Sequence, residues 1–414
     1  MAQPRVVIIG GGFGGLSAAK ALKGAPVDVL LLDRRNHHVF QPLLYQVATA
    51  ALSPGDIASP IRWVLRHQRN VHVWLAEATG VDSDRRVVKL KDGEVAYDYL
   101  IVASGSTHAY FGHDEWQQYA PGLKTLDDAL EMRRRVLVAF EQAERESDKA
   151  RQRRLLTFVV IGGGPTGVEL AGSLAEISRH ALANDFRTID PESARIILIE
   201  GGASVLSTYS ASLSAYARTA LERLGVAVWT GSLVTNVAEG RVQVGGETIE
   251  AGTILWAAGV SASPIGKSLG APLDRVGRVL VNDDLTIPGH PEIAVAGDLA
   301  ALKDADGTWL PGVAQVAIQQ AEHAAKNIRH ALAGQPRQPF RYRNFGNLAT
   351  IGRNTAIADL PRLKMKGYPA WLFWLFVHIL KLVGFRNRIS VLVNWAASYM
   401  TYQRSVRLIT RDDA

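Results

Sequence analysis

Short apolar runs alternate with glycine loops in the first part of the chain. Residues 5–9 have the continuous apolar pattern of a buried parallel strand, and a glycine loop follows at once. Residues 16–22 then begin a helical pattern, and residues 27–32 form a second apolar run that ends in Asp33. The order of strand, loop, helix and strand predicts a βαβ unit in a parallel sheet.

The same order of patterns returns in the middle of the chain. Residues 155–161 form a strand-like run before a glycine loop, residues 168–182 continue as a helix, and residues 195–199 form an apolar strand that ends in Glu200. An insertion at residues 184–193, interpreted as a loop, places this acid further from its glycine loop than in the first unit. The repetition predicts an α/β fold with two Rossmann-like dinucleotide-binding domains.

Both glycine loops have the spacing G-x-G-x-x-G, which suits the binding of a dinucleotide. The first glycine permits a tight turn, the second lets the backbone approach a pyrophosphate, and the third lets the helix pack on the strand. The N-terminus of the helix adds N–H groups that face the phosphates. These glycines are Gly10, Gly12 and Gly15 in the first loop and Gly162, Gly164 and Gly167 in the second. An ordinary strand–helix turn is the alternative for each loop, but two complete units predict two dinucleotides bound at once.

The acid at the end of each second strand predicts how the ribose is held. Asp33 and Glu200 are placed to accept hydrogen bonds from ribose hydroxyl groups. A carboxylate at Glu200 would also repel a 2′-phosphate, which favours NADH over NADPH. The simplest assignment is a tightly held flavin dinucleotide in the first unit and a mobile nicotinamide dinucleotide in the second.

Composition and charge narrow the classes of partner. The chain is 47% hydrophobic and 21% charged, as in globular proteins, and its net charge of +7 suits an anionic partner such as a dinucleotide or a membrane surface. No nucleic-acid-binding module is recognisable, so no nucleic acid is expected. The absence of cysteine excludes disulfides and thiol catalysis. His37 and His38 are adjacent, so their side chains diverge, and no metal site is predicted.

Three further stretches complete a family resemblance. Residues 101–105 (I-V-A-S-G), 255–259 (L-W-A-A-G) and 295–299 (V-A-G-D-L), together with the two glycine loops, resemble the two-dinucleotide-binding flavoprotein family. The resemblance implies that the aspartate of the last stretch binds the ribitol chain of a flavin, and that the Ala-Gly runs close the backs of the two sites. The residues assigned in this way are Gly105, Gly259, Gly297 and Asp298.

Within that family, the sequence resembles the type II NADH:quinone oxidoreductases. Disulfide reductases and sulfide:quinone oxidoreductases use cysteines, which this chain lacks. Residues 40–47 (F-Q-P-L-L-Y-Q-V), 162–172 (G-G-G-P-T-G-V-E-L-A-G), 314–321 (A-Q-V-A-I-Q-Q-A) and 384–388 (G-F-R-N-R) carry the resemblance. It implies non-covalent FAD, hydride transfer from NADH to flavin N5, two-electron reduction of a membrane quinone in a ping-pong cycle, and no proton pumping. A homodimer is also expected.

The resemblance gives roles to three polar residues. Glu169 would lie at the junction of nicotinamide and flavin and handle protons, whereas the alternative is a carboxylate that only favours the helix dipole. Gln315 and Gln319 lie four residues apart on one helix face and would bind the quinone head, whereas the alternative is a solvated face. Tyr45 and Gln46 are expected near the flavin, without an assigned role.

The last part of the chain has the pattern of a membrane anchor. Residues 371–383 are apolar nearly all round a helix and residues 389–402 add an aromatic-rich stretch, with Lys364 before them and Arg404 and Arg407 after. Thirteen helical residues rise about 20 Å, less than the ~30 Å of a hydrocarbon core. The pattern predicts two amphipathic helices in one leaflet, and the alternative is a buried subdomain or a dimer interface.

The expected organisation follows from these patterns. An FAD domain at residues 1–120 and 285–340 is interrupted by an NADH domain at 121–284, and residues 341–414 form the membrane-associated part. Since the chain enters its first strand without a signal peptide, we expect it at the cytoplasmic face of the inner membrane. Lys381 is expected to bind quinone or phospholipid. The rival functions are a soluble ferredoxin- or rubredoxin-type reductase and an NADH-binding flavoprotein that acts as a sensor.

Overall fold

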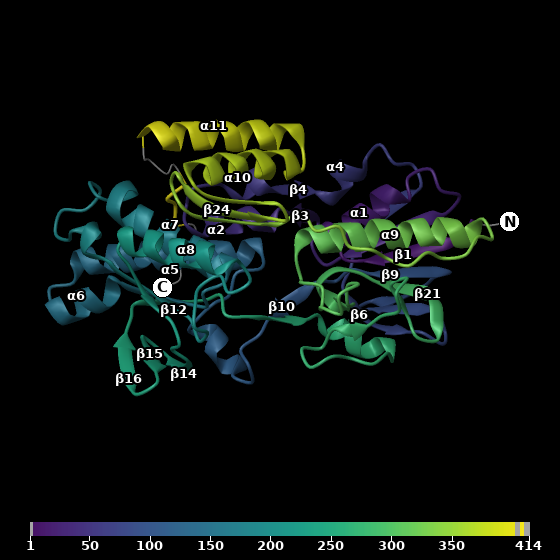
Figure 1. The fold of residues 1–414 in the computed structure, drawn as a ribbon, viewed down its shortest axis with the longest axis horizontal. Helices are drawn as coiled ribbons and strands as arrows, with labels where there is room; N and C mark the ends of the chain where they lie inside the picture. The colour runs from purple at the N-terminus through teal and green to yellow at the C-terminus, as the bar shows by residue number, and fades with distance from the viewer. Residues whose placement is uncertain (1–2, 402–405, 410–414) are drawn as a thin grey trace. The chain divides into compact units, whose positions relative to one another are not determined.

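The computed structural model describes residues 3–401 and 406–409 (Figure 1). The chain forms two compact units, each built from three separate segments. Unit 1 comprises Met1–Val39, Ala58–Thr107 and Val260–Asn344, and unit 2 comprises Phe40–Ile57, His108–Gly259 and Phe345–Ala414. Each unit contains one of the two predicted glycine loops, and each is described by itself below.

Unit 1 is built on a six-stranded sheet in the order β20-β21-β9-β1-β2-β5. Neighbouring strands from β21 to β5 are parallel, and β20 adds an antiparallel edge. The central strand β1 has the near-continuous apolar sequence RVVII because both faces of the sheet are covered. The strands are β1 (Arg5–Ile9), β2 (Asp28–Asp33), β5 (Val71–Leu75), β9 (Tyr99–Val102), β20 (Thr286–Ile287) and β21 (His290–Val295).

Helices α1 (Phe13–Ala21) and α9 (Ala314–Leu332) pack against each other in unit 1 (Figure 1). The small residues at their contact explain the alanine-rich sequence of α9. A Cβ atom added to Gly14 would lie 3.5 Å from the carbonyl oxygen of Ala317 and 3.7 Å from the Cβ of Ala321. The alanine-rich face therefore packs on the flanking helix of the first glycine loop.

Unit 2 has a four-stranded parallel sheet in the order β13-β12-β11-β17. Helix α7 (Pro165–Glu176) follows the second glycine loop and continues into a π-helical turn at Ile177–Ala181. The long helix α5 (Leu126–Arg145) begins with a capping box between Thr125 and Asp128. The strands are β11 (Thr157–Ile161), β12 (Arg195–Ile199), β13 (Val226–Trp229) and β17 (Thr253–Trp256), and α8 (Ala211–Arg223) precedes β13.

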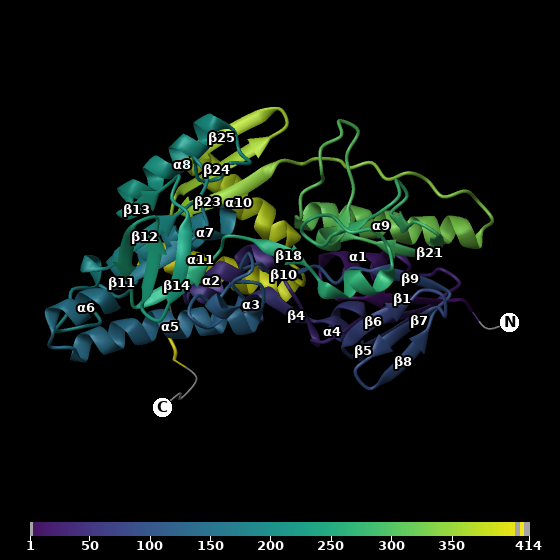
Figure 2. The ribbon, with the colours of Figure 1, turned by 90° about the horizontal axis from the view of Figure 1, so that it is seen from below.

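The C-terminal part of the chain belongs to unit 2. It begins with an antiparallel sheet of β23 (Asn347–Gly352), β24 (Thr355–Leu360) and β25 (Leu363–Gly367), which lies beside α8 (Figure 2). Strand β23 packs closely on α7, since a Cβ atom on Gly172 would lie 1.7 Å from the carbonyl oxygen of Ile351. This sheet was not foreseen in the sequence, and it fixes the tail to the helix that carries Glu169.

The two tail helices are confirmed, with shifted ends. Helix α10 spans Tyr368–Lys381 and α11 spans Phe385–Thr401, and they lie side by side in Figure 1. Tyr402 and Arg404, which the sequence assigned to this anchor, lie outside the described residues. In the part of the chain that the structure describes, no helix meets the length and hydrophobicity needed to cross a membrane.

The compact units divide the chain at other residues than the expected domains. The crossings lie after Thr107 and before Val260, whereas residues 120 and 285 were expected. The difference near residue 260 arises because the 3-10 helix Pro264–Leu269 packs on strand β6 (Ala78–Asp82) of unit 1. Similarly, Phe40–Ile57 belongs to unit 2, since its helix α2 (Leu44–Ala48) packs on α5 and α7.

Candidate functional site

The first glycine loop has room for a ligand at one position and no room at two others. Gly10 has a φ of +100°, and a Cβ atom there would lie 2.4 Å from the carbonyl oxygen of Ala103. A Cβ atom on Gly15 would lie 1.7 Å from the carbonyl oxygen of Gly10. In contrast, no protein atom lies within 4 Å of a Cβ atom on Gly12. Gly10 and Gly15 thus make the tight turn, and Gly12 leaves an open approach to the helix N-terminus.

The second glycine loop repeats this geometry. Gly162 has a φ of +111°, and its Cβ atom would lie 2.5 Å from the carbonyl oxygen of Ala257. The Cβ atom of a residue in place of Gly167 would lie 1.8 Å from the carbonyl oxygen of Gly162, and that of Gly164 would again meet nothing within 4 Å. The chain therefore builds the same open, N–H-lined cradle twice, once in each unit.

The two acids at the strand ends hold their glycine loops in place. Oδ2 of Asp33 accepts a hydrogen bond of 2.5 Å from the backbone N–H of Gly11. Oε2 of Glu200 accepts one of 2.6 Å from Gly163 in the same way. The other oxygen of each carboxylate accepts from a backbone N–H two residues further along the chain. Each carboxylate still has lone pairs for a ribose, so these residues combine a structural role with the predicted binding role.

A second set of residues in unit 1 surrounds the predicted flavin aspartate. Oδ2 of Asp298 accepts a hydrogen bond of 2.6 Å from the hydroxyl of Ser106. Gly297 has a φ of +78°, and its N–H donates to Oε1 of Gln320 at 2.7 Å. Gly105 has a φ of +69° and open space where a Cβ atom would be. Gln320 is fully buried in α9 and shapes the loop that presents Asp298.

The family resemblance gave the quinone role to Gln315 and Gln319, which lie in the same helix α9 as Gln320. Gln319 donates from Nε2 to the carbonyl oxygen of Arg343 at 3.0 Å and accepts from the N–H of Arg343 at 3.0 Å. This bidentate pairing ties the segment after α9 to the helix. Gln315 lies half-buried in the first turn of α9, whose N-cap residue Val313 supplies no side-chain hydrogen bond. The structure therefore pairs Gln319 with Arg343, and it reveals Gln320 as the residue that supports the loop before Asp298.

Glu169 lies half-buried in α7 beside a cavity of unit 2. Its Oε1 atom accepts one long hydrogen bond of 3.5 Å, from the N–H of Thr350. Burial raises the pKa of Glu169 to about 8, although the N–H of Thr350 acts in the opposite direction. The residue lies beyond the first turn of its helix, so the helix dipole does not account for it.

The cavity beside Glu169 is lined by both polar and aromatic side chains. Nε2 of Gln46 donates to the hydroxyl of Tyr45 at 2.8 Å, and the indole of Trp395 donates to Oε1 of Gln46 at 2.8 Å. Tyr45 and Gln46, which the sequence left without a role, therefore line the same cavity as Glu169. The apolar and aromatic part of the lining includes Trp371, Trp374, Leu375, Trp395 and Tyr399.

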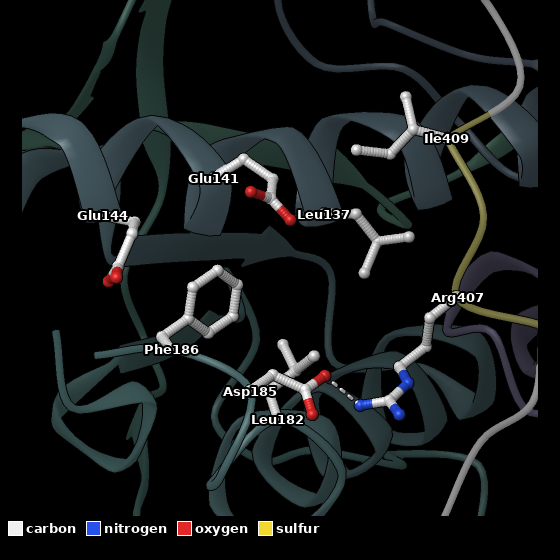
Figure 3. Close-up of a pocket in the computed structure, with 8 residues that line it drawn as sticks. All are labelled: Leu137, Glu141, Glu144, Leu182, Asp185, Phe186, Arg407 and Ile409. Atoms are coloured by element: carbon white, nitrogen blue, oxygen red, sulfur yellow. Dashed lines mark hydrogen bonds and ion pairs between the residues drawn. The ribbon is translucent and has the colours of Figure 1, made fainter. Parts of the chain in front are cut away.

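His38, a possible metal site and a second hollow were also considered as functional features. His38 is buried, which lowers its pKa to about 4, and its Nδ1 lies 3.1 Å from the carbonyl oxygen of Gly11. Among the described residues, no group of His, Cys, Asp or Glu side chains has the arrangement of a metal site. A second hollow lies between α5 and the tail, where Arg407 pairs with Asp185 (Figure 3).

Two models of known protein families match this chain, one over the part with the glycine loops and one over the C-terminal part. The model of the pyridine nucleotide-disulphide oxidoreductase family matches residues 4–326. The model of the NDH2 C-terminal domain matches residues 345–403. The first match covers both glycine loops. The second covers strand β23 and helices α10 and α11, which contribute residues to the lining of the cavity beside Glu169.

Individual relatives match the whole chain. The type II NADH:quinone oxidoreductase Ndh of Mycobacterium tuberculosis is 46% identical, over 100% of this chain and 92% of the relative. The type II NADH:quinone oxidoreductase NdhA of the same organism is 47% identical, over 98% of this chain and 89% of the relative. The structure of NDH2 from Plasmodium falciparum in complex with NADH has the same fold, with a TM-score of 0.90, 21% identity and coverage of 99% of this chain and 100% of the other.

Proposed function

Because this chain belongs to the family of type II NADH:quinone oxidoreductases, we propose that it oxidises NADH and reduces a membrane quinone, with FAD as its resident cofactor. The balanced reaction consumes NADH, one proton and a quinone and yields NAD⁺ and a quinol, without proton pumping. The observation that carries this function is the repeated glycine-loop geometry, one copy in each unit, in a chain without cysteine. The two loops suit two dinucleotides, and without a cysteine the reduced flavin has to pass its electrons to the acceptor without a protein thiol.

The residues of unit 1 fit the FAD that the family implies. The open space at Gly12 and the N-terminus of α1, whose N-cap residue supplies no side-chain hydrogen bond, suit the pyrophosphate, and Asp33 suits a ribose. Asp298, held by Ser106, would face the ribitol chain. When bound, FAD supplies the centre that accepts a hydride from NADH and passes two electrons to the quinone.

The residues of unit 2 fit NADH. The open space at Gly164 suits its pyrophosphate, and the carboxylate of Glu200 is placed to accept from the adenosine ribose hydroxyls. Because Glu200 already accepts from the N–H of Gly163, its position is fixed before the ligand binds. A 2′-phosphate near this carboxylate would be repelled, which supports NADH over NADPH.

The cavity beside Glu169 is the proposed site of the quinone head. Its aromatic side chains offer flat apolar surface, while Tyr45 and Gln46 supply polar groups. Glu169, with a pKa of about 8, carries a proton near pH 7 and is able to donate it to a quinone oxygen. For Gln315 and Gln319 of unit 1, the family resemblance alone implies a contact with the quinone.

The surface of the tail supports attachment to a membrane. On α10, Leu372, Phe376 and Leu380 are exposed at intervals of four residues, which makes one apolar stripe. On α11, Ile389, Leu392 and Val393 are also exposed. We place this face in one leaflet at the cytoplasmic side of the inner membrane, where it would admit a lipid-soluble quinone. Lys381, exposed at the end of α10, would contact phospholipid or quinone, and the expected assembly is a homodimer.

The experiment that tests the function is stopped-flow absorbance in the flavin band of the detergent-purified protein. NADH is mixed in first and a short-chain quinone second. Rapid bleaching by NADH and rapid recovery with quinone are the expected results. Recovery only with a protein acceptor would instead support a ferredoxin- or rubredoxin-type reductase, and slow recovery with every acceptor would support a sensor.

A further inference from the structure

Phe111 has an unusual conformation for a bulky residue. Its side chain is 69% exposed, and its backbone φ is +54°, in the left-handed region that favours glycine. Gly112 follows with a φ of +93°. A phenylalanine keeps such a conformation only where neighbouring contacts hold the backbone, and residues of this kind occur often at ligand sites.

Two hydrogen bonds anchor Ala109, two residues before Phe111, on the end of strand β17 and the residues after it. The N–H of Ala109 donates to the carbonyl oxygen of Gly259 at 3.2 Å, and the indole of Trp256 donates to the carbonyl oxygen of Ala109 at 3.0 Å. The ring of Phe111 then lies directly over Gly259, since a Cβ atom there would lie 2.7 Å from Cζ of Phe111. Gly259 therefore makes room for the ring, and the segment is anchored on the buried Trp256.

The position of β17 in the sheet shows which part of a dinucleotide lies near Phe111. In the order β13-β12-β11-β17, the glycine loop follows β11 and Glu200 follows β12, while Gly259 lies beyond the end of β17. The carboxyl ends of parallel strands share one edge of the sheet. With the pyrophosphate at Gly164 and the adenosine ribose at Glu200, the other half of the dinucleotide extends toward β17.

We infer that the ring of Phe111 packs against the nicotinamide ring of NADH and is a specificity-determining residue for that ring. The inference rests on the proposed function, because it takes NADH as the ligand of unit 2. An exposed aromatic face over a glycine offers a flat surface for a ring, and its burial by the ligand would remove apolar area from water. The strained backbone holds that face in position before the ligand arrives.

The test compares two ligands that share the adenosine and pyrophosphate but differ in the nicotinamide. Calorimetric titration of the holoenzyme with NAD⁺ and with ADP-ribose reads the nicotinamide contact as the ratio of the two affinities. In Phe111→Ala and Phe111→Gly, we expect NAD⁺ to bind about tenfold more weakly and ADP-ribose to bind as in the wild type. Phe111→Tyr should bind both ligands normally, since it keeps the ring.

Phe111→Ala and Phe111→Gly together separate the effect of losing the ring from the effect of the backbone conformation. Glycine adopts the left-handed conformation freely, whereas alanine retains part of its cost. Loss in Phe111→Ala alone, equal loss for both ligands, or no loss would each overturn the inference. The matched control is Trp74→Ala, which removes a 47% exposed aromatic side chain from strand β5 of unit 1 and should change neither affinity.

Flavin bleaching by NADH, measured together with the titrations, distinguishes a failure of this inference from a failure of the proposed function. If NADH fails to bleach the flavin of the wild type, the proposed function is wrong whatever the variants do. If the wild type is bleached normally and the Phe111 variants keep the wild-type ratio of NAD⁺ to ADP-ribose affinity, only the inference is wrong. The expected supporting result is normal bleaching of the wild type with a selective loss of NAD⁺ affinity in the two ring-less variants.

Discussion

The backbone N–H of Thr350 donates to Oε1 of Glu169 at 3.5 Å, which is long for a hydrogen bond. Thr350 lies in β23 and Glu169 lies in α7, so the contact joins residues 181 positions apart in the chain. A weak donor cannot offset the removal of the carboxyl group from water, and the pKa therefore rises to about 8. The side chain of Glu169, which lines the cavity, is therefore protonated near pH 7.

The first prediction concerns the pH dependence of quinone reduction. Because Glu169 loses its proton as the pH rises through about 8, we expect the rate of flavin reoxidation by quinone to fall above that pH in the wild type. In Glu169→Gln, which resembles the protonated acid but has no acidic proton, the rate should be about a hundredfold lower and independent of pH. Stopped-flow reoxidation from pH 6 to pH 10 measures both effects.

The control for this prediction is Glu141→Gln, an exposed carboxylate on α5 that lies outside the cavity beside Glu169. It should reproduce the wild-type rate and pH profile. A pH profile in Glu169→Gln that still falls near pH 8 would contradict the role of Glu169, because another group would then have to supply the proton.

The glycine loops give a second prediction, on binding without loss of fold. Gly12 has a φ of −71°, and a methyl group there would meet no atom within 4 Å outside its chain neighbours, so Gly12→Ala should fold. Its flavin-free form should melt like the flavin-free wild type, because bound flavin itself stabilises the fold. The methyl group would occupy the approach to the pyrophosphate, and we expect flavin content to fall about tenfold. The ratio of flavin to protein absorbance measures this loss.

Gly164→Ala is the matched variant in the other unit, with a φ of −70° and the same open space. It should retain its flavin but bind NAD⁺ about tenfold more weakly. Loss of flavin in Gly164→Ala and retention of flavin in Gly12→Ala would reverse the assignment of the two cradles.

These loops also show which features were predictable from sequence. A strand, three spaced glycines, a helix and a terminal acid are adjacent or nearly adjacent in the chain, so local rules are sufficient to place them. The apolar tail helices were found for the same reason, since each is one continuous run in the sequence. The α/β fold with two Rossmann-like domains is confirmed by the two parallel sheets and by the family match.

The features that were missed depend on contacts between distant segments. Gln319 and Gln320 are neighbours in sequence, but only the packing of α9 shows that Gln319 pairs with Arg343 and that Gln320 supports Gly297. Gln320 lies four residues after the buried Val316, so it is a polar residue on the apolar face of α9. That position could have indicated a buried side chain with a hydrogen-bond partner. The β23–β25 sheet was missed because each of its strands has only five or six residues, too few for the pattern to stand out beside the long apolar run that follows.

A third prediction concerns the choice between NADH and NADPH. Glu200→Gln removes the negative charge but keeps one oxygen that is able to accept from the N–H of Gly163. Without the repulsion of a 2′-phosphate, we expect the ratio of kcat/KM for NADH to that for NADPH to fall about tenfold. Steady-state assays with each nucleotide and one short-chain quinone measure the ratio.

Asp33→Asn is the corresponding variant of the first unit and serves as the control. Its carboxylate makes the same kind of contact with its own loop, to Gly11. It should affect flavin content and leave the nucleotide preference of the remaining holoenzyme unchanged. An unaltered preference in Glu200→Gln would mean that another group selects the nucleotide.

The last prediction concerns the exposed apolar stripe of the tail. Phe376 is 61% exposed on α10 and Val393 is 60% exposed on α11. A carboxylate placed at either position would have to leave water if these helices lie in a leaflet, so Phe376→Glu and Val393→Glu should each reduce binding to anionic phospholipid vesicles about tenfold or more. Co-sedimentation with the vesicles measures the binding.

The activities of the same variants distinguish a membrane contact from a folding defect. A water-soluble short-chain quinone reaches the cavity without lipid, so its reduction should stay near the wild-type rate, while reduction of a long-chain quinone embedded in the vesicles should fall with the bound fraction. Val276→Glu changes a 41% exposed residue of unit 1 and should alter neither binding nor activity. If the tail variants still bind vesicles but change from dimer to monomer in size-exclusion chromatography, the stripe is covered by a second copy of the chain instead of lipid.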